Sequence, residues 1–419
     1  MKKATAILMA TLLVLSLVPF SMASAAEPVT IKFANYALLE TGYTEFWEGV
    51  KTGFEAQNPH VTIEWVTAPY GEIVTQVINM AGGGDKVDLM LGETGWTPTM
   101  EDVGLSVPVS AILTQEYLDG FFPNLLEAHE VNGECYALPL FVSPFILFYN
   151  TEIFAKAGLD PAAPPTTYDE MLEMAEKIAA LTSDDGNKIY PFGQTTASRP
   201  VSGSSLTSMV YNFGGNVLEQ DGTLSVDNEG FKQTFELLKL LEEKGYNPQN
   251  ALLKDLRNLF ALGQLAMYYD TSWGFNGISS INGDAASFTA SAAPLAGGAG
   301  NGDSILQANT LIFMDNGEAN REAVRLLVEY LITEEVLGDY MRTITPAYPA
   351  TKAMDGMVGN PVLDGAADSI SKTLALTFVP ALSDFNLELC TLAQAITVGG
   401  EDVDSAIAAF VTAAQAILQ

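Results

Sequence analysis

Four aromatic residues have the chemistry and the place in the chain to stack on a ligand. They are Tyr36, Trp96, Trp273 and Tyr348. Trp273 is the most informative, because it follows a short expected strand over residues 266–269 and precedes a glycine, as a side chain at a cleft edge would. Sugar rings have one apolar C–H face that packs on tryptophan or tyrosine. The alternative interpretation is that these rings fill the hydrophobic core.

Two carboxylates lie close to these rings in the sequence. Glu93 stands shortly before Trp96, and Asp270 shortly before Trp273. Carboxylates accept hydrogen bonds from sugar hydroxyls, so both are candidate ligand contacts. A glycosidase also needs two facing carboxylates, and Glu93 with Asp270 is the pair that we nominate for this enzymatic alternative.

Other catalytic chemistry has little support in the chain. Its two histidines, His60 and His129, are expected to be solvated rather than catalytic. The sequence has no zinc-binding pattern, no nucleophile elbow and no phosphate-binding glycine loop. The acidic turn at residues 184–186 lacks the spacing of a calcium loop. The sequence therefore indicates no enzyme, no cofactor and no metal site.

The charge balance restricts the partners. The formal net charge is -32, from 19 Lys and Arg against 51 Asp and Glu. Nucleic-acid binding depends on neutralising phosphates with Lys and Arg, so neither DNA nor RNA is an expected partner, and anionic membrane surfaces are disfavoured. A chain of 419 residues is long for one core and predicts two domains.

Residues 1–25 have the pattern of a secretory signal peptide. Lys2-Lys3 precedes an apolar run over residues 6–20, and Ala23-Ser24-Ala25 fits a small-x-small cleavage site. We expect a mature chain that starts at Ala26 and is secreted to the periplasm or the extracellular space. An uncleaved membrane anchor is the alternative. There is no cysteine near the cleavage point, so the sequence does not indicate a lipid anchor there.

The chain has two cysteines, Cys135 and Cys390. Export makes a disulfide between them possible. Two buried free thiols are the interpretation that we favour.

The N-terminal part alternates expected strands and helices. The strands are expected over 29–35, 61–66 and 87–91, and the helices over 44–57 and 70–81. This alternation predicts an α/β fold with a parallel sheet covered by helices. Ligands of such sheets bind beyond the carboxyl ends of the strands, where Tyr36, Glu93 and Trp96 lie.

The segment 132–150 predicts a link between two domains. It begins with an Asn-Gly turn signal and continues as an apolar run that suits a strand buried on both faces. Pro139 and Pro144 interrupt this run, and proline cannot donate to a sheet. We expect a chain that leaves one sheet here, crosses a gap and enters a second sheet.

Six stretches resemble, in order, motifs of the family 1 extracellular solute-binding proteins, the maltose-binding-like receptors of ABC importers. They are 54–59 (FEAQNP), 83–88 (GGDKVD), 132–139 (NGECYALP), 149–159 (YNTEIFAKAGL), 165–170 (PTTYDE) and 260–267 (FALGQLAM), the last followed by Trp273. Each motif is weak alone, but the ordered set is specific and covers nearly all of the mature chain. One departure is the segment 270–272, which stands where the family usually has a glycine before the tryptophan.

The resemblance implies a two-lobed periplasmic-binding-protein fold of the class II type, with a ligand cleft between hinge-linked lobes. Lobe 1 is expected over 27–138 plus 292–338 and lobe 2 over 142–288 plus 344–419, with crossings near 139–141, 289–291 and 343.

The resemblance also implies a function and completes the expected site. The protein would bind a sugar or oligosaccharide between its lobes and deliver it, as a monomer, to the permease subunits of an ABC transporter. Phe141 and Ser143 would lie at the floor of the cleft, and Asn309 would hydrogen-bond to hydroxyls. The rings of Tyr36, Trp96 and Trp273 would stack on the sugar.

Two alternatives stay open beside this hypothesis. Another polar solute, such as a polyamine, would suit the acidic charge. A carboxylate-dependent glycosidase would use the same cleft for catalysis. Residues 194–216 match no motif, so contacts from this region cannot be expected from the resemblance, and neither can the identity of the sugar.

Overall fold

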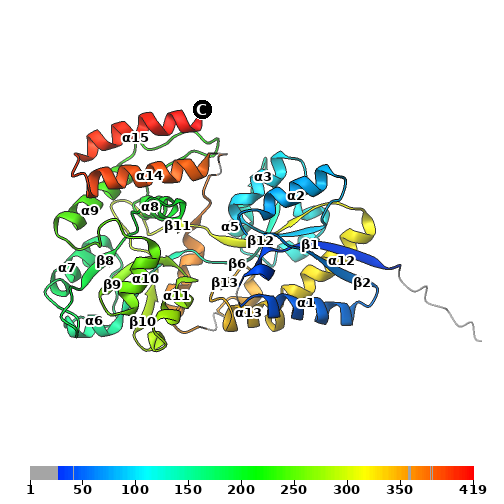
Figure 1. Cartoon of the computed structure of the whole chain (residues 1–419), viewed down its shortest axis with the longest axis horizontal. Helices are drawn as coiled ribbons and strands as arrows, with labels where there is room; N and C mark the ends of the chain where they lie inside the picture. Colours follow the sequence, from blue (N-terminus) through cyan, green and yellow to red (C-terminus); the bar gives the residue numbers. More distant parts are fainter. Residues whose placement is uncertain (1–26, 41, 357–359, 378, 380) are drawn as a thin grey trace, which may run out of the picture.

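The structure is a computed structural model that describes residues 27–40, 42–356, 360–377, 379 and 381–419, and these form two lobes (Figure 1). Lobe 1 holds the blue N-terminal segments, and lobe 2 holds the green middle of the chain and the red C-terminal helices. The two-lobed α/β architecture expected from the sequence is confirmed. The expected signal peptide, residues 1–25, lies outside the described residues.

Lobe 1 is built on a sheet whose described strands follow the order β13-β6-β12-β3-β1-β2. These strands are β1 (Val29–Ala34), β2 (Val61–Val66), β3 (Leu89–Glu93), β6 (Ala137–Val142), β12 (Ala308–Phe313) and β13 (Tyr348–Pro349). β1 pairs in parallel with β2 and β3, as the strand–helix alternation predicts, whereas β12 runs antiparallel to β3 and β6. Late segments of the chain thus complete a sheet that the N-terminal segment begins.

Helices cover this sheet, and a hairpin lies beside it. The helices are α1 (Thr44–Gln57), α2 (Ile73–Gly82), α3 (Thr97–Asp102), α4 (Gln115–Leu118), α5 (Pro123–Glu127), α12 (Glu318–Leu331) and α13 (Asp339–Thr343), and the hairpin strands are β4 (Glu130–Val131) and β5 (Glu134–Cys135). Helix α1 buries Trp47, Val50 and Phe54, which recur at the helical period and so lie on one face. The predicted Asn-Gly turn joins the hairpin, with positive φ at Asn132 (55°) and Gly133 (82°).

Lobe 2 is built on the sheet β10-β7-β9-β8. Its strands are β7 (Phe145–Asn150), β8 (Tyr190–Gly193), β9 (Leu265–Thr271) and β10 (Thr289–Ala292), and a separate pair is formed by β11 (Ser304–Ile305) and β14 (Thr373–Leu374). Its helices are α6 (Thr151–Lys156), α7 (Tyr168–Ile178), α8 (Pro200–Asn212), α9 (Glu229–Glu243), α10 (Leu253–Ala261), α11 (Gly274–Ile281), α14 (Leu382–Thr397) and α15 (Val403–Leu418). Helices α14 and α15 pack on α8 and α9 (Figure 1). Within the described residues, no helix has the length and apolar character needed to cross a membrane.

Helix α7 starts with a capping box formed by Thr167 and Glu170. The Thr167 side chain accepts a hydrogen bond from the Glu170 backbone N–H at 3.2 Å, and the Glu170 carboxylate accepts one from the Thr167 N–H at 3.3 Å. Two backbone N–H groups at the N-terminus of α7 therefore find partners within four residues, so the start of this helix depends on local sequence alone.

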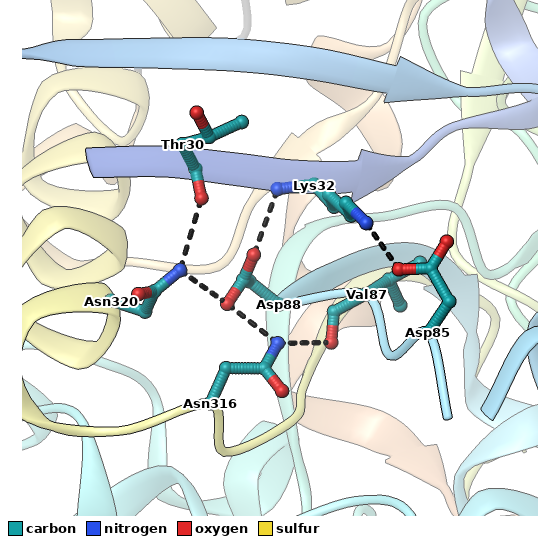
Figure 2. A network of polar contacts seen from close by, with 7 residues as sticks. All are labelled: Thr30, Lys32, Asp85, Val87, Asp88, Asn316 and Asn320. Carbon is teal, nitrogen blue, oxygen red and sulfur yellow. Dashed lines mark hydrogen bonds and ion pairs between the residues drawn. The ribbon is translucent and has the colours of Figure 1, made fainter. Parts of the chain in front are cut away.

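A buried carboxylate ties three segments of lobe 1 together at the end of the sheet away from the carboxyl ends of β1 and β3 (Figure 2). Asp88, just before β3, accepts hydrogen bonds from the Lys32 backbone N–H in β1 at 2.8 Å and from the side-chain amides of Asn316 at 2.8 Å and Asn320 at 2.9 Å. The Asn320 amide also donates to Thr30 O at 3.0 Å. The network joins β1, β3 and the start of α12. It therefore stabilises the contact between the N-terminal strands of the sheet and a helix that comes more than 200 residues later in the chain.

The first change of sheet comes just after the expected crossing at 139–141, because β6 keeps these residues in the sheet of lobe 1 and β7 belongs to that of lobe 2, with only Ser143 and Pro144 between them. The expected crossing at 289–291 needs correction. Strand β10 pairs with β7, Ala292 lying opposite Leu147, so the change of sheet comes later, between β11 and β12.

The expected crossing at 343 also needs correction. Strand β13 pairs with β6, which keeps residues 348–349 in the sheet of lobe 1. The 3-10 helix Asp364–Lys372 then packs on β10, where a Cβ on Gly365 would lie 2.1 Å from Ser291 O. The third crossing therefore falls between β13 and Asp364. Alternation of polar and apolar residues does not distinguish one buried sheet from another, so only pairing fixes these boundaries.

Buried hydroxyls connect the segments that pass between the lobes. Ser143 Oγ lies 2.7 Å from Ser272 Oγ, and Ser272 Oγ donates to Pro346 O at 2.9 Å. The Ser143 backbone N–H donates to Gln307 O at 2.7 Å. We refer to these four residues as the hinge network. Ser143 was expected at the floor of the cleft. Its side chain instead lies fully buried in the hinge network.

The two cysteines are both free. Cys390 is buried in α14, whereas Cys135 is half-buried in the hairpin of lobe 1. The favoured interpretation of two buried free thiols therefore holds for Cys390, whereas Cys135 is free but only half-buried.

Candidate functional site

Two adjoining pockets lie between the lobes, and we call them the inner and outer pockets. The inner pocket has a volume of about 120 Å³ and is lined mainly from lobe 1. The outer pocket has a volume of about 480 Å³ and is lined from both lobes. Tyr70, Glu93 and Trp273 line both pockets, so the two form one site. A volume of several hundred Å³ is in the range of small-molecule sites.

Aromatic rings dominate the inner pocket, where seven of the thirteen lining residues are aromatic. Tyr36, Tyr70 and Trp96 form an aromatic triangle at the mouth between the pockets, with ring centroids 5.1–5.6 Å apart. Trp273 faces this site from lobe 2, at the N-terminus of α11. The sequence thus identified Tyr36, Trp96 and Trp273 as residues that the fold brings together.

Glu93 and Asn309 lie beside these rings at the edge of the lobe 1 sheet. Glu93 ends β3 and pairs in register with Asn309 of β12. Tyr70 donates a hydrogen bond to Glu93 Oε2 at 2.6 Å, and the Asn309 amide donates to the Tyr36 hydroxyl at 2.8 Å. These bonds fix the orientation of the carboxylate and of both phenol rings, which is the preorganisation that a binding site needs.

The electrostatics of the site are set by burial. Burial raises the pKa of the Glu93 carboxyl, and the hydrogen bond from Tyr70 opposes that shift. Glu40, at the rim of the inner pocket, also has its pKa raised by burial, and its negative charge adds to the rise at Glu93. Burial likewise raises the pKa of Tyr36 and Tyr70, so both phenols stay protonated donors at neutral pH.

Three expected site residues lie outside both pockets. Asp270 is fully buried and accepts two hydrogen bonds from Arg257, at 2.6 and 2.8 Å. Ser143 belongs to the hinge network. Tyr348 is fully buried in β13 and donates its hydroxyl to Leu363 O at 2.9 Å. Phe141, by contrast, lines the inner pocket. The carboxylate pair nominated for a glycosidase is therefore not assembled, because Asp270 faces Arg257 and not the cleft.

The Arg257–Asp270 ion pair instead lies under Trp273. Asp270 Oδ2 would be 2.2 Å from a Cβ placed on Gly274, so the carboxylate packs directly against the first turn of α11. The Tyr268 hydroxyl and the Thr271 backbone N–H donate further hydrogen bonds to Asp270, at 3.2 and 2.8 Å. Asp270 thus supports the helix start that carries Trp273.

His129 is buried, which corrects the expectation that it is solvated. Burial lowers the pKa of His129 to about 4, so the ring is neutral at pH 7. Its Nδ1 lies 2.6 Å from Leu125 O, a carbonyl that can only accept, so Nδ1 carries the hydrogen. Nε2 must then accept from the Thr94 hydroxyl at 3.2 Å. Thr94 also lines the outer pocket. Because its hydroxyl hydrogen is donated to His129, the Thr94 oxygen can only accept a hydrogen bond from a ligand there.

Several lining residues were missed by the sequence analysis. Tyr70 follows β2 and lines both pockets, so the carboxyl-end rule that points to Tyr36 and Glu93 applies to it as well. The lobe 2 wall of the outer pocket comes from α8 and α14, through Pro200, Ser204 and Asn386. No motif marks these residues, because they reach the cleft only through the packing of the C-terminal helices.

Residues 37–337 match the family model described as bacterial extracellular solute-binding protein. A maltotriose-binding protein of Pyrococcus abyssi is 27% identical over 220 residues, which cover 51% of this chain and 45% of that protein. The sn-glycerol-3-phosphate-binding periplasmic protein of Agrobacterium fabrum is 27% identical over 206 residues, covering 49% of this chain and 45% of that protein. A Brucella abortus protein named as a putative binding protein is 27% identical over 262 residues, which cover 60% of this chain and 60% of that protein. The alignments with these three relatives therefore span between 45% and 60% of the relatives' own length.

Solved structures share the fold. The cyclic α-maltosyl-1,6-maltose binding protein of Arthrobacter globiformis superposes with a TM-score of 0.80 at 17% identity, covering 93% of this chain and 99% of that chain. The sugar-binding protein of Xanthomonas citri gives a TM-score of 0.78 at 18% identity, covering 93% and 97%. At such identities the similarity concerns the arrangement of the two lobes.

Proposed function

Because the chain belongs to the bacterial extracellular solute-binding protein family, we propose that it is the receptor of an ABC importer for a sugar or oligosaccharide. It binds this ligand between its lobes as a monomer, outside the cytoplasmic membrane, and delivers it to the permease subunits. It does so without catalysis. Closure of the lobes on the ligand follows from the hinge arrangement, and the ligand biases closure by its higher affinity for the closed form.

The lining of the two pockets is the observation that carries this proposal. Aromatic rings from both lobes stand beside a carboxylate and an amide, and among the described residues no Lys, Arg or His lines either pocket. Stacking surfaces with hydrogen-bonding groups suit a sugar, whose rings have apolar faces and whose edges carry hydroxyls. The maltotriose-binding relative supports the same ligand class.

The pocket lining argues against a phosphorylated ligand, although relatives named for sn-glycerol 3-phosphate match equally well by identity. A phosphate is bound most strongly by Arg or Lys side chains, and within the described residues neither type lines the two pockets. Here the half-buried Glu93, with Glu40 at the rim, would repel it. We therefore expect sn-glycerol 3-phosphate not to bind.

A thermal-shift screen of the purified protein tests the proposal. The panel holds mono- and oligosaccharides including maltose and maltotriose, together with sn-glycerol 3-phosphate, polyamines and amino acids. A ligand that binds only the folded state raises the midpoint of unfolding with its concentration. We expect sugars to raise it, without the appearance of any hydrolysed product. A panel in which no sugar acts and another class does would overturn the sugar assignment, and sugar turnover would overturn the absence of catalysis.

A further inference from the structure

Glu93 is a half-buried carboxylate that has no cationic partner within the described residues. Its hydrogen bonds within the described residues come from neutral phenols, Tyr70 at 2.6 Å and Tyr36 at 3.5 Å. The ion pairs of the described residues do not include Glu93 or Glu40. Buried charges in proteins are usually paired, because removing a carboxylate from water is costly. This one instead faces a pocket.

The surroundings of Glu93 suit a positive charge in two further ways. The aromatic rings of the inner pocket present π systems, which attract a cation placed over a ring face. Glu40 adds a second negative charge at the rim, and this charge raises the pKa of the Glu93 carboxyl further, beyond the larger effect of burial. A neutral ligand would leave the charge of Glu93 without a counter-charge, whereas water solvates the exposed Glu40.

The outer pocket also offers unused hydrogen-bond acceptors, beside the indole N–H of Trp273, which has no partner within the described residues. Asn386 of α14 is 4% exposed and lines this pocket, and its amide nitrogen already donates to Ser204 Oγ at 3.2 Å. Its Oδ1 has no hydrogen-bond partner in the part of the chain that the structure describes. Thr94, whose hydrogen is used by His129, is a further acceptor. A ligand that carries N–H or O–H donors fits these acceptors, and the indole N–H of Trp273 can take one acceptor of the same ligand.

We propose that the site selects a ligand with a positively charged amino group, which occupies the inner pocket beside Glu93, so that amino sugars bind in preference to neutral sugars. This inference rests on the proposed sugar-receptor function for its ligand class. The amino group satisfies the carboxylate, and the sugar ring stacks at the aromatic triangle and Trp273. The neighbouring rings of an oligosaccharide extend into the outer pocket, toward Asn386.

Titration calorimetry at pH 7 tests the inference with matched probes. Glucosamine and its β-1,4-linked dimer and trimer are compared with the same compounds N-acetylated and with glucose and its β-1,4-linked dimer and trimer. We expect the amino forms to bind at least about tenfold more tightly, because a carboxylate and an ammonium group a few Å apart attract strongly in a partly buried site.

Two variants assign the preference to the pocket. Glu93→Gln keeps an oxygen for the Tyr70 hydroxyl but removes the charge, and Glu40→Gln removes the rim charge at an exposed position. We expect Glu93→Gln to abolish the amino-sugar preference and Glu40→Gln to reduce it. Glu173→Gln, on the exposed face of α7, is the matched control and should leave the preference unchanged.

The outcomes separate this inference from the proposed function. If neutral sugars bind as tightly as amino sugars, or if the preference survives in both Glu93→Gln and Glu40→Gln, the inference is overturned while the sugar receptor stands. If no sugar binds but choline or spermidine does, and Glu93→Gln abolishes that binding, the cation site stands and the sugar assignment fails. Failure of every ammonium probe to bind overturns the inference.

Discussion

The Arg257–Asp270 ion pair offers a test of how the structure supports Trp273. Arg257→Met removes the guanidinium while keeping an unbranched side chain in α10. Asp270 then keeps only the Tyr268 hydroxyl and the Thr271 backbone N–H, at 3.2 and 2.8 Å, and neither neutralises its charge. The Asp270 side chain is 0% exposed, so water cannot compensate for the loss without local opening.

The magnitude follows from this geometry. Breaking a buried ion pair by removing one partner costs about 3–5 kcal/mol. The Arg257 side chain is 28% exposed, so solvent reaches that side of the pair and the lower end of the range applies. We expect Arg257→Met to lower the free energy of unfolding by about 3 kcal/mol. Asp270→Asn leaves the unpaired charge on the more accessible Arg257 and should cost less, about 1–2 kcal/mol.

Urea unfolding of the two single variants and the double variant gives the coupling free energy. We expect the double variant to be more stable than the sum of the single effects predicts, by about 2 kcal/mol, because it leaves no unpaired buried charge. Arg325→Met is the control, since the Arg325 side chain is similarly exposed at 27% but pairs with exposed carboxylates on α12. It should cost no more than about 1 kcal/mol.

The reasoning fails if Arg257→Met costs no more than the Arg325→Met control, or if the coupling is zero. Sugar affinity adds a second readout. Because the carboxylate packs against the first turn of α11, Arg257→Met should weaken binding as Trp273→Ala does, but to a smaller extent, whereas Arg325→Met should leave binding unchanged.

Three further predictions concern the cleft, the sheet and the pH dependence. Trp273→Ala should weaken sugar binding by about 1–3 kcal/mol in titration calorimetry through lost stacking, and unchanged affinity would remove Trp273 from the site. Asp88→Ala should lower the free energy of unfolding by about 2–4 kcal/mol, since it strands donors around a residue that is 2% exposed, with ligand affinity unchanged. The neutral His129, with its pKa lowered to about 4, binds fewer protons in the folded than in the unfolded state, so stability should fall as pH drops from about 6.5 toward 4. His129→Gln should flatten that part of a urea-midpoint profile against pH, and an unchanged slope would contradict this assignment.

Local sequence signals determined many of the elements. The start of α7 follows from its capping box, the turn of the β4–β5 hairpin from Asn132-Gly133, and helix α1 from apolar residues at the helical period. These features depend on interactions within a few residues, which is why they can be read from one chain. The carboxyl-end rule also placed Tyr36, Glu93 and Trp96 together, because neighbouring parallel strands end at one edge.

Only the tertiary structure decided between residues that look alike in sequence. Glu93 and Asp270 both follow apolar strands and both precede a tryptophan, yet Glu93 lines the pockets while Asp270 is held by Arg257 from the preceding helix. Asn386 reaches the outer pocket because α14 packs back onto α8. Strand pairing likewise places all three changes of sheet later in the chain than expected. Each of these outcomes depends on which distant segments pack together. The free energy of that packing comes from contacts between residues far apart in the chain, so the spacing of neighbouring residues does not reveal it.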